Sequence, residues 1–546
     1  MRTGLVWGAV AVFLALVGMV ETFAGRHIVS DTPSLGVLLL MLAAAAAGYQ
    51  GAAGGTPWGG GQLLRSLVAG ALTGAMVTVL IAAGSILDLR RVFVGASPSL
   101  FLLLSFGLGP AGAYLPVLAG GAAGLIGGVL SLMVPGVRGP IVAGLVAVLA
   151  VGLFQELLQV MLAEGAAQEA IRDVLFTFDG LSPGGAVILF VGTAAARALW
   201  VRAAPPARAR LARLSARPAR AVRGLALLAG VGALVLLPLA AGPFLAHVLV
   251  LVGLYMLMGL GLNLEVGYAG LLDLGFVAFF AIGAYTVGLL TSTGGLAVLD
   301  LSFWVAVPIA VAIALAAGVI LGIPVLRIRG DYLAIATLGF GEIIRLLVLS
   351  DFLRPWLGGS QGVLGIRKPV FVGVELATPE QIFYLTLAAS GIVAFVAARL
   401  RDSRLGRAWM ALREDEDVAE AMGIDLVNVK LLAYGLGASF AGVSGAIFAV
   451  MVGSVFPHSF QLLISINVLA LIIVGGMGST PGVMVGALFL VGLPELLREF
   501  ADFRFLIYGA ALVLMMQLRP EGLWPAAAIR RELHAPEELD PVQRAI

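Results

Sequence analysis

Between two hydrophobic runs lies RLRDSRLGRAWMALREDEDVAEAMGIDLVNVK, Arg399 to Lys430, which carries most of the clustered charge in the second half of the chain. Charged side chains are costly inside a bilayer, so this segment does not continue the apolar runs beside it. We therefore expect a folded loop at the membrane surface, where a membrane protein meets soluble partners.

The rest of the chain has the composition of an integral membrane protein. Of its 546 residues, 60% are hydrophobic and 12% are charged, whereas about a quarter of the residues of a soluble domain are charged. Apolar runs long enough to cross ~30 Å of hydrocarbon as helix recur throughout. They are continuous rather than alternating as in barrel strands. The sequence predicts an all-α, polytopic transmembrane helical protein.

Several functional classes are excluded by simple counts. The formal net charge of +2 is too small to suggest a nucleic-acid partner. The absence of cysteine excludes disulfides, thiolate metal ligands and cysteine nucleophiles. Neither the zinc motif HExxH nor the phosphate-binding motif GxxxxGKS/T occurs. No metal site is expected, and any ATP used must be hydrolysed by another polypeptide.

A basic segment, residues 201–223, divides the chain. Its sequence VRAAPPARARLARLSARPARAVR holds seven arginines, three prolines and no acid, which indicates a cytoplasmic linker. Its arginines either contact anionic lipid or are solvated. Around it we expect an N-terminal transmembrane extension of unknown role (1–200), a second transmembrane domain (224–518) and a cytoplasmic tail (519–546).

Counting spans from the linker assigns each connection to a side of the membrane. The count leaves the charged loop and the tail in the cytoplasm and residues 351–380 outside. The first apolar run is expected to be a transmembrane helix rather than a cleaved signal peptide. The candidate spans lie near 4–20, 34–48, 66–87, 98–134 (long enough for a broken pair), 139–163, 183–201, 224–241, 246–264, 271–291, 303–323, 331–349, 380–399, 431–453, 461–476, 481–499 and 504–518.

Within the charged loop, the sequence predicts a helix, a tight turn and a second helix. Acids crowd the start of a helix-compatible run from Glu414 to Glu420, where they suit the helix dipole. Gly423 is placed to end that helix in the left-handed conformation. Asp425 is placed to cap the helix that enters the membrane at Leu431. An ordinary solvated loop is the alternative.

Residues of this loop resemble a known motif. Asp417, Val418 and Ala419, followed by three residues and Gly423, resemble the Glu-Ala-Ala-x-x-x-Gly loop of ABC importer permeases. The first two positions differ from the family by mild changes. The surrounding AWMALREDEDVAEAMGIDLVNVKLLAY is more similar still to the LivM-like branch, permeases for branched-chain amino acids and related compounds.

Four further stretches extend the resemblance over about residues 225–520, in the family's order. Residues 1–200 resemble neither this branch nor its usual sister permease. The four stretches are GLNLEVGYAGLLDLGFVAFFAIGAY (Gly261 to Tyr285), RIRGDYLAIATLGFGEIIRLL (Arg327 to Leu347), GGSQGVLGIRKP (Gly358 to Pro369) and IIVGGMGSTPGVMVGALFL (Ile472 to Leu490).

The resemblance implies an ABC permease domain over 224–518 in a subunit of an ATP-driven importer of the bacterial inner membrane. Its substrates would be branched-chain or related amino acids, or small amides, moved by alternating access. The expected partners are a LivH-like permease, two ABC ATPase subunits that bind ATP and Mg, and an extracytoplasmic binding protein. This chain itself would hold no cofactor and catalyse no reaction. Contact with the ATPase is expected at Glu414, Asp417, Val418, Ala419, Glu420 and Gly423.

A candidate translocation path follows from glycines and charges inside the spans. Helices broken by glycine, as at Gly267-Tyr268-Ala269-Gly270, expose backbone N–H groups and helix ends to a path. Intramembrane charges, including Glu265, Asp331 and Arg345, must face protein or water. Glu342 and Arg345 are three residues apart on one helix and are expected to pair. The candidate path residues are Gly267, Tyr268, Gly270, Asp273 and Glu342.

Two other functions are weighed against the importer. An ion-driven secondary transporter would use the intramembrane acids as its coupling site. An intramembrane serine protease would use the string Gly442-Val443-Ser444-Gly445 with His458 downstream. A serine nucleophile needs a base within hydrogen-bond reach, and His458 follows Pro457 in an expected external connection. Close packing of small residues explains the string without catalysis.

Overall fold

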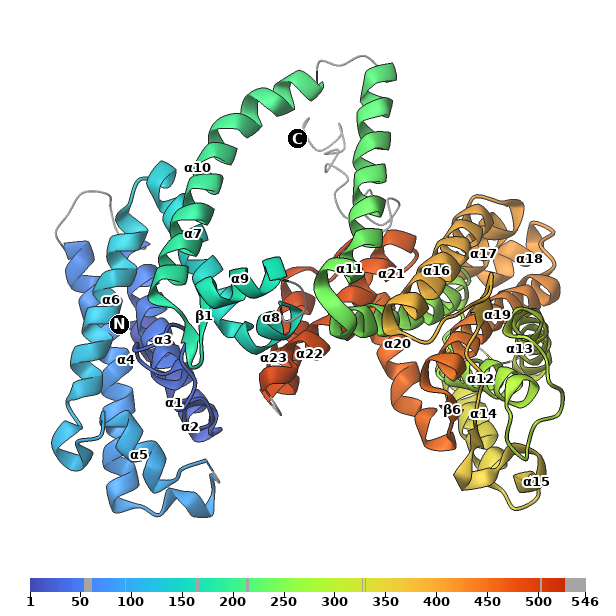
Figure 1. Cartoon of the computed structure of the whole chain (residues 1–546), viewed down its shortest axis with the longest axis horizontal. Helices are drawn as coiled ribbons and strands as arrows, with labels where there is room; N and C mark the ends of the chain where they lie inside the picture. Colours follow the sequence, from blue (N-terminus) through green and yellow to red (C-terminus); the bar gives the residue numbers. More distant parts are fainter. Residues whose placement is uncertain are drawn as a thin grey trace, which may run out of the picture. The chain divides into compact units, whose positions relative to one another are not determined.

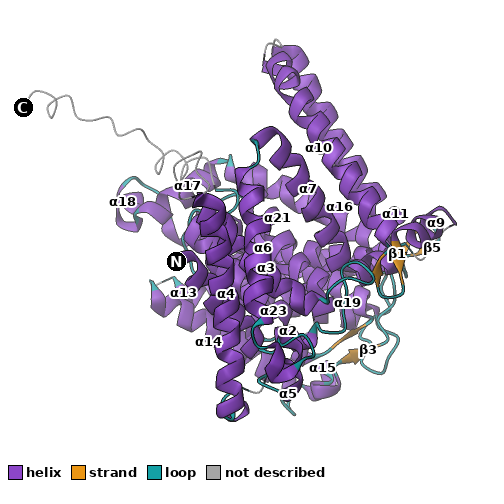
Figure 2. Ribbon diagram, turned by 90° about the vertical axis from the view of Figure 1, so that its left-hand side faces the viewer, coloured by secondary structure: helices purple, strands orange, loops and turns teal. Residues whose placement is uncertain are grey.

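The computed structural model describes the chain outside residues 54–60, 94, 163–165, 213–215, 327, 329, 501–502 and 526–546. The described residues are mainly helical, with a few two-residue strands (Figure 2). This confirms the predicted all-α architecture. They form two compact units, Met1–Ala229 and Gly230–Ile546. The boundary falls inside helix α11 (Ala216–Leu262), whose course is clear in Figure 1.

The first unit is a bundle around helices α3, α4 and α6, on which α1 also packs, while α7 packs against α10. Short 3-10 turns lie at Leu89–Arg91 and Gly109–Gly112. A hairpin joins β1 (Phe176–Thr177) and β2 (Gly180–Leu181). The helices are α1 (Arg2–Leu16), α2 (Met19–Thr22), α3 (Leu35–Ala53), α4 (Gly61–Ile86), α5 (Pro98–Leu104), α6 (Leu115–Leu132), α7 (Pro135–Leu153), α8 (Gln155–Met161), α9 (Ala166–Leu175) and α10 (Pro183–Ala212).

Glycine lets the helices of this bundle approach backbone to backbone. A Cβ added at Gly74 of α4 would lie 1.9 Å from the carbonyl oxygen of Pro116 on α6. One added at Gly48 of α3 would lie 2.0 Å from the carbonyl oxygen of Gly124. Small residues at helix crossings are the usual means of close packing between membrane helices.

Among its described residues, the second unit contains the remaining helices and two short strand pairs. Strand β3 (Val363–Leu364) pairs with β6 (Ser454–Val455), and β4 (Val370–Phe371) pairs with β5 (Val374–Glu375). Its helices after α11 are α12 (Val277–Thr291), α13 (Phe303–Val325), α14 (Asp331–Leu349), α15 (Arg354–Leu357), α16 (Pro379–Arg401), α17 (Arg404–Glu414), α18 (Glu416–Ala421), α19 (Leu426–Val452), α20 (Leu462–Gly475), α21 (Thr480–Ala487), α22 (Leu493–Leu496) and α23 (Phe503–Leu518), with π-helical turns at Asn263–Tyr268 (η3) and Leu488–Gly492 and 3-10 turns at Gly359–Gln361, Pro457–Ser459 and Leu497–Phe500.

Helix α19 forms the centre of the second unit and packs against α12 and α13. Glycines again allow the approach. A Cβ at Gly445 would lie 2.0 Å from the carbonyl oxygen of Phe280 on α12, and one at Gly318 of α13 would lie 2.5 Å from that of Tyr434. Much of α19 is consequently buried, including Ser444 and Ala438 at 0% exposure.

Eleven helices among the described residues are long and apolar enough to cross a membrane, which makes this a multi-pass membrane protein. The predicted span 98–134 is broken, into α5 and α6. The span predicted from residue 271 becomes helical only at Val277, because the chain turns at Gly270 with φ 73°. The basic segment 201–223 lies largely in the ends of α10 and α11, since alanine and arginine favour helix. Most of the predicted tail lies outside the described residues.

Candidate functional site

The charged loop folds into two short helices, α17 and α18, before α19 begins. Ser403 accepts a hydrogen bond from the Gly406 amide at 3.2 Å and caps α17. Asp415 accepts from the amides of Asp417 and Val418 at 3.0 Å each and caps α18. Such caps satisfy the free N–H groups at a helix start. Neither cap was predicted from the sequence.

The turn after α18 has the predicted geometry. Gly423 has φ 83°, a left-handed conformation that suits glycine. Asp425 then caps α19 by accepting from the Asn428 amide at 3.2 Å. The helix, tight turn and helix predicted for this stretch are therefore confirmed.

The candidate ATPase-contact residues lie mostly on the exposed side of this loop. Val418 is 58% exposed, and the adjacent Met422 is 79% exposed. Ala419 is the exception, since it is buried at 3% exposure. The exposed candidates are Glu414, Asp417, Val418, Glu420 and Gly423.

On its buried side, the loop contacts α19 through a hydrogen bond and an ion pair. Trp409 of α17 is fully buried, and its indole N–H donates to the Val429 carbonyl at 2.9 Å. Lys430 is buried and forms an ion pair with Glu416 of α18. An ammonium buried in this way requires such a partner, because an unpaired buried charge is strongly unfavourable.

The glycine-broken helix adjoins the same loop. In η3 the Ala269 amide donates to the Leu264 carbonyl at 3.1 Å, as in a π-helix, and the chain leaves the helix at Gly270. Asn263 accepts from the Gly478 amide at 2.9 Å, which joins the break to the turn between α20 and α21. π-Helical turns of this kind are frequent at functional sites.

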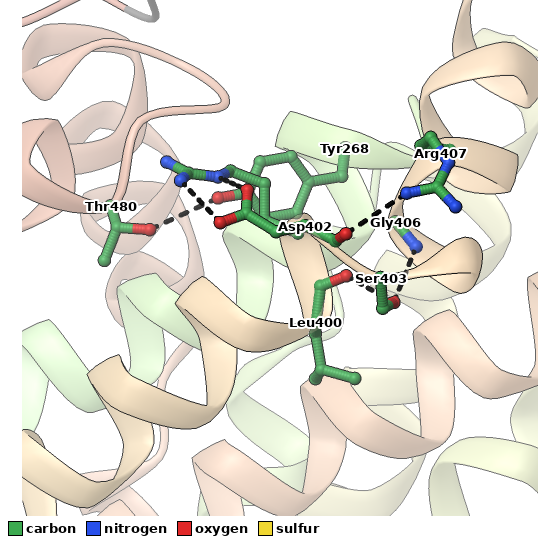
Figure 3. A network of polar contacts seen from close by, with 8 residues as sticks. Tyr268, Leu400, Asp402, Ser403, Gly406, Arg407 and Thr480 are labelled. Carbon is green, nitrogen blue, oxygen red and sulfur yellow. Dashed lines mark hydrogen bonds and ion pairs between the residues drawn. The ribbon is translucent and has the colours of Figure 1, made fainter.

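Tyr268 ends the π-helical turn beside the start of the loop (Figure 3). Its hydroxyl lies 3.3 Å from Thr480 Oγ1. Asp402 lies close to it and accepts from Arg401, whose Nε donates at 2.8 Å and Nη2 at 3.2 Å. These hydrogen bonds hold the pKa of the Asp402 carboxyl below its usual value.

Two intramembrane acids are enclosed at this break. Asp273 is fully buried, and its Oδ1 accepts from the Gly275 amide at 2.6 Å. Glu265 is also fully buried and lies next to Asp273. The sequence indicated that both acids would avoid lipid, and the structure encloses them in protein.

The structure brings together four of the five candidate path residues. Gly267, Tyr268, Gly270 and Asp273 lie on one short, broken segment. Glu342 instead lies on α14, where Arg345 Nε donates to its two carboxylate oxygens at 3.1 and 3.0 Å. This is the pair predicted from their spacing. Trp409, Lys430, Asn263 and Arg413 were not predicted as site residues, because their contacts join segments far apart in the sequence.

The arrangement needed by a serine protease is not found. Ser444 is fully buried in α19, and its hydroxyl donates to the Leu254 carbonyl at 2.9 Å. His458 lies beyond the end of α19 and stacks on Phe456, with ring centroids 5.3 Å apart. The hydroxyl of Ser444 and the ring of His458 thus each contact other residues rather than one another, and helix packing accounts for the small residues.

Comparison with known proteins agrees with the resemblance seen in the sequence. The profile of the family described as branched-chain amino acid transport system / permease component matches residues 244–517. The high-affinity branched-chain amino acid transport system permease protein LivM of Escherichia coli K12 is 43% identical over 295 residues, covering 50% of this chain and 68% of that protein.

More distant relatives match within the same family. A probable branched-chain amino acid transport permease protein LivM of Methanocaldococcus jannaschii is 22% identical over 333 residues, covering 52% of this chain and 94% of that protein. The permease protein LivH of Salmonella typhimurium is 27% identical over 194 residues, covering 33% of this chain and 62% of that protein. No solved structure matches. The chain belongs to the family of branched-chain amino acid transport system permease components.

Proposed function

We propose that this permease is a subunit of an ATP-driven importer that moves branched-chain or related amino acids, or small amides, by alternating access. Its partners are a LivH-like permease, two ABC ATPases that hold ATP and Mg, and an extracytoplasmic binding protein. The membrane is the bacterial inner membrane. The names of the relatives, LivM and LivH of branched-chain amino acid transport systems, support this assembly.

The proposal rests mainly on helix α18. One side of this helix is exposed, and its loop is held to α19 by side-chain contacts. Val418 and Met422 present apolar side chains among acids, a surface suited to a protein partner. Trp409 and the Glu416–Lys430 pair connect this surface to the start of α19. Movement of a docked ATPase would therefore reach the centre of the permease.

The far end of α19 is attached to the segment expected to face the binding protein. Lys368 donates from Nζ to the carbonyls of Val450 at 2.6 Å and Met451 at 2.9 Å. A cation at these last carbonyls stabilises the helix end. Burial lowers the pKa of the Lys368 ammonium. Helix α19 thus connects the ATPase-facing loop with the external connection, as alternating access requires.

Reconstitution tests the source of energy. The permease, its sister permease, the ATPases and the binding protein would be placed in proteoliposomes, and uptake measured with ATP, without ATP, and with ATPases lacking their P-loop lysine. We expect uptake only with ATP and intact ATPases. Uptake that continues without ATP and stops with a sodium or proton ionophore would instead establish a secondary transporter.

The secondary transporter remains the second candidate because of Glu265 and Asp273. Both are fully buried and lie next to each other. Buried intramembrane acids are the coupling groups that such transporters use. The reconstitution above separates the two functions.

Substrate and orientation need separate measurements. A thermal-shift screen of the cognate binding protein against amino acids and small amides would identify the substrate. Since the chain has no cysteine, single cysteines report orientation through a membrane-impermeant thiol reagent on intact cells. Ser360→Cys, in the external segment, is expected to be labelled and Glu420→Cys, in the loop, to be protected. The reverse pattern would overturn the predicted topology.

A further inference from the structure

One side chain of the loop reaches the broken helix directly. Arg413 lies in the last turn of α17, two residues before Asp415, the cap of α18. Its Nη1 donates to the Gly267 carbonyl at 2.7 Å. The contact joins residues 146 positions apart in the sequence, and a hydrogen bond from a charged donor is stronger than a neutral one.

The stem of the same arginine covers the point where the helix breaks. Gly270 has φ 73°, and a Cβ there would lie 3.0 Å from Arg413 Cγ and 3.3 Å from its Cα. Glycine is needed at this position both for the backbone angle and for the close approach. Arg413 therefore spans the break, with its head on Gly267 and its stem over Gly270.

The opposite side of the break is held by another connection. A Cβ at Gly267 would lie 2.8 Å from the Gly478 amide nitrogen, which itself donates to Asn263 at 2.9 Å. The broken segment is thus enclosed between the turn at Gly478 and the loop at Arg413. Of these two contacts, only that of Arg413 belongs to the loop that the ATPase would move.

Two other anchors of the loop end on α19. Trp409 donates to Val429, and Glu416 pairs with Lys430, so both act on the first turns of α19. That helix is continuous from Leu426 to Val452. A broken segment has fewer internal hydrogen bonds than a continuous helix and rearranges more readily. The loop is thus connected both to the continuous helix α19 and to the more deformable break at Gly267–Gly270.

We propose that Arg413 is a positioning residue that transmits movement of the ATPase-facing loop to the helix break at Gly267–Gly270, an inference that rests on the proposed importer function. While α17 holds its place, the guanidinium fixes the Gly267 carbonyl. When the loop moves, the break moves with it, and the buried segment that contains Asp273 is repositioned.

The test compares Arg413→Gln with Arg413→Lys and with a control, Arg407→Gln. Arg407 lies on the same helix, and its Nη1 donates to the Asp402 carbonyl at 3.2 Å rather than to the break. In proteoliposomes of the whole importer, ATP hydrolysis and uptake are measured together. For Arg413→Gln we expect hydrolysis within about twofold of wild type and uptake per ATP lowered about tenfold, the effect of losing one hydrogen bond to a charged donor.

Arg413→Lys keeps a charge and a donor but lacks the fork and the reach of arginine. It should fall between wild type and Arg413→Gln in uptake per ATP, while Arg407→Gln should match wild type. Equal losses of hydrolysis and uptake in Arg413→Gln, or no loss, would overturn the inference. Wild-type importer without ATP-dependent uptake would instead overturn the proposed function.

A second measurement decides the case if Arg413→Gln does not assemble. Hydrogen exchange is followed in the assembled importer containing wild type or Arg413→Lys. We expect faster exchange at residues 263–276 in the variant and unchanged exchange over the first turns of α19. Unchanged exchange at 263–276, or an equal rise in both regions, would show that Arg413 does not act on the break.

Discussion

Glycine allows close helix packing in both units of this protein, but the two units differ in where charged side chains are buried. In both, glycines bring helix backbones into contact, as Gly74 does in the first unit and Gly445 in the second. Among the described residues, however, the buried charged side chains Glu265, Asp273 and Lys430 all belong to the second unit. Burying a charge costs stability, so it is expected where a helix must respond to a partner or substrate. The family match, residues 244–517, lies in this second unit.

The largest expected difference in uptake is between variants that break one ion pair in each unit. In the second unit, the Lys430 and Glu416 side chains are 5% and 20% exposed. In the first, Arg91 and Asp88 are 82% and 63% exposed and lie 3.1 Å apart. Breaking a buried pair costs ~3–5 kcal/mol, whereas an exposed pair contributes ~0–1 kcal/mol.

Glu416→Gln should therefore release the ATPases during purification and abolish uptake, while Asp88→Asn should change neither. Co-purification of the ATPases and uptake in matched membranes are the measurements. Similar behaviour of the two variants would mean that the buried pair does not support the loop.

A smaller effect is expected from the glycine packing of the first unit. Gly74→Ala places a methyl 1.9 Å from the Pro116 carbonyl oxygen, whereas the Cβ of Gly139→Ala, on α7, meets nothing within 4 Å. Overpacking costs ~1–3 kcal/mol, while alanine in an open helical position stabilises by ~0.4–1 kcal/mol. The melting temperature of the detergent-purified chain should fall for the first variant and not for the second.

Both alanine variants should retain wild-type uptake per folded protein if the first unit is a static support. Loss of uptake by Gly74→Ala with an unchanged melting temperature would place the first unit in the transport cycle.

Substitution of Gly423 tests whether the loop needs the left-handed backbone conformation at this position. Both Gly423 and Gly391 have open space for a side chain, since nothing lies within 4 Å of either Cβ position, but only Gly423 has a positive φ, 83°. The left-handed conformation costs a β-branched residue ~1–2 kcal/mol, about a 5- to 30-fold change in an equilibrium. Gly423→Val should lower uptake by that factor, whereas Gly391→Val in α16 should not.

Gly423→Asn provides the matched control, because asparagine is accepted at this helix-ending position. Uptake is measured in membranes with equal amounts of permease. Wild-type uptake by Gly423→Val would remove the basis for the coupling assignment of the loop.

The local features of the loop could be predicted because their causes are local. Gly423 and Asp425 follow from turn and cap chemistry within a few residues, and the Glu342–Arg345 pair follows from helical spacing. Hydropathy predicted the spans, but it placed a helix start at 271, where the turn at Gly270 delays it to Val277. Composition alone does not show where a helix turns aside to approach another segment.

The contacts that organise the site could not be predicted in the same way. Arg413 reaches Gly267 across 146 residues, and Trp409 reaches Val429 across 20. Each depends on how helices pack after folding, which one sequence does not reveal. The sequence indicated that Asp273 and Glu265 would be kept from lipid, but only the structure shows them enclosed around the same break.

Removal of the first unit is expected to have the smallest effect on transport. The family match begins at residue 244, and the motif that resembles a coupling loop occurs only in the second unit. A unit without contact to the ATPase does not receive its movement directly. A truncated chain that begins at Ala204, with an added start codon, keeps most arginines that set its orientation.

This shortened chain should insert correctly and, with its partners co-expressed, transport within about twofold of the full chain, a change of ~0.4 kcal/mol that lies within the usual effect of altering a surface. Apolar helix faces uncovered by the truncation are a competing cause of failure, so assembly with the sister permease and the ATPases is checked by co-purification before uptake is compared. If the shortened chain assembles and has the stability of the full chain but transports nothing, the first unit belongs to the translocation path. The interpretation of the first unit as a static support and of the second as the moving unit would then be wrong.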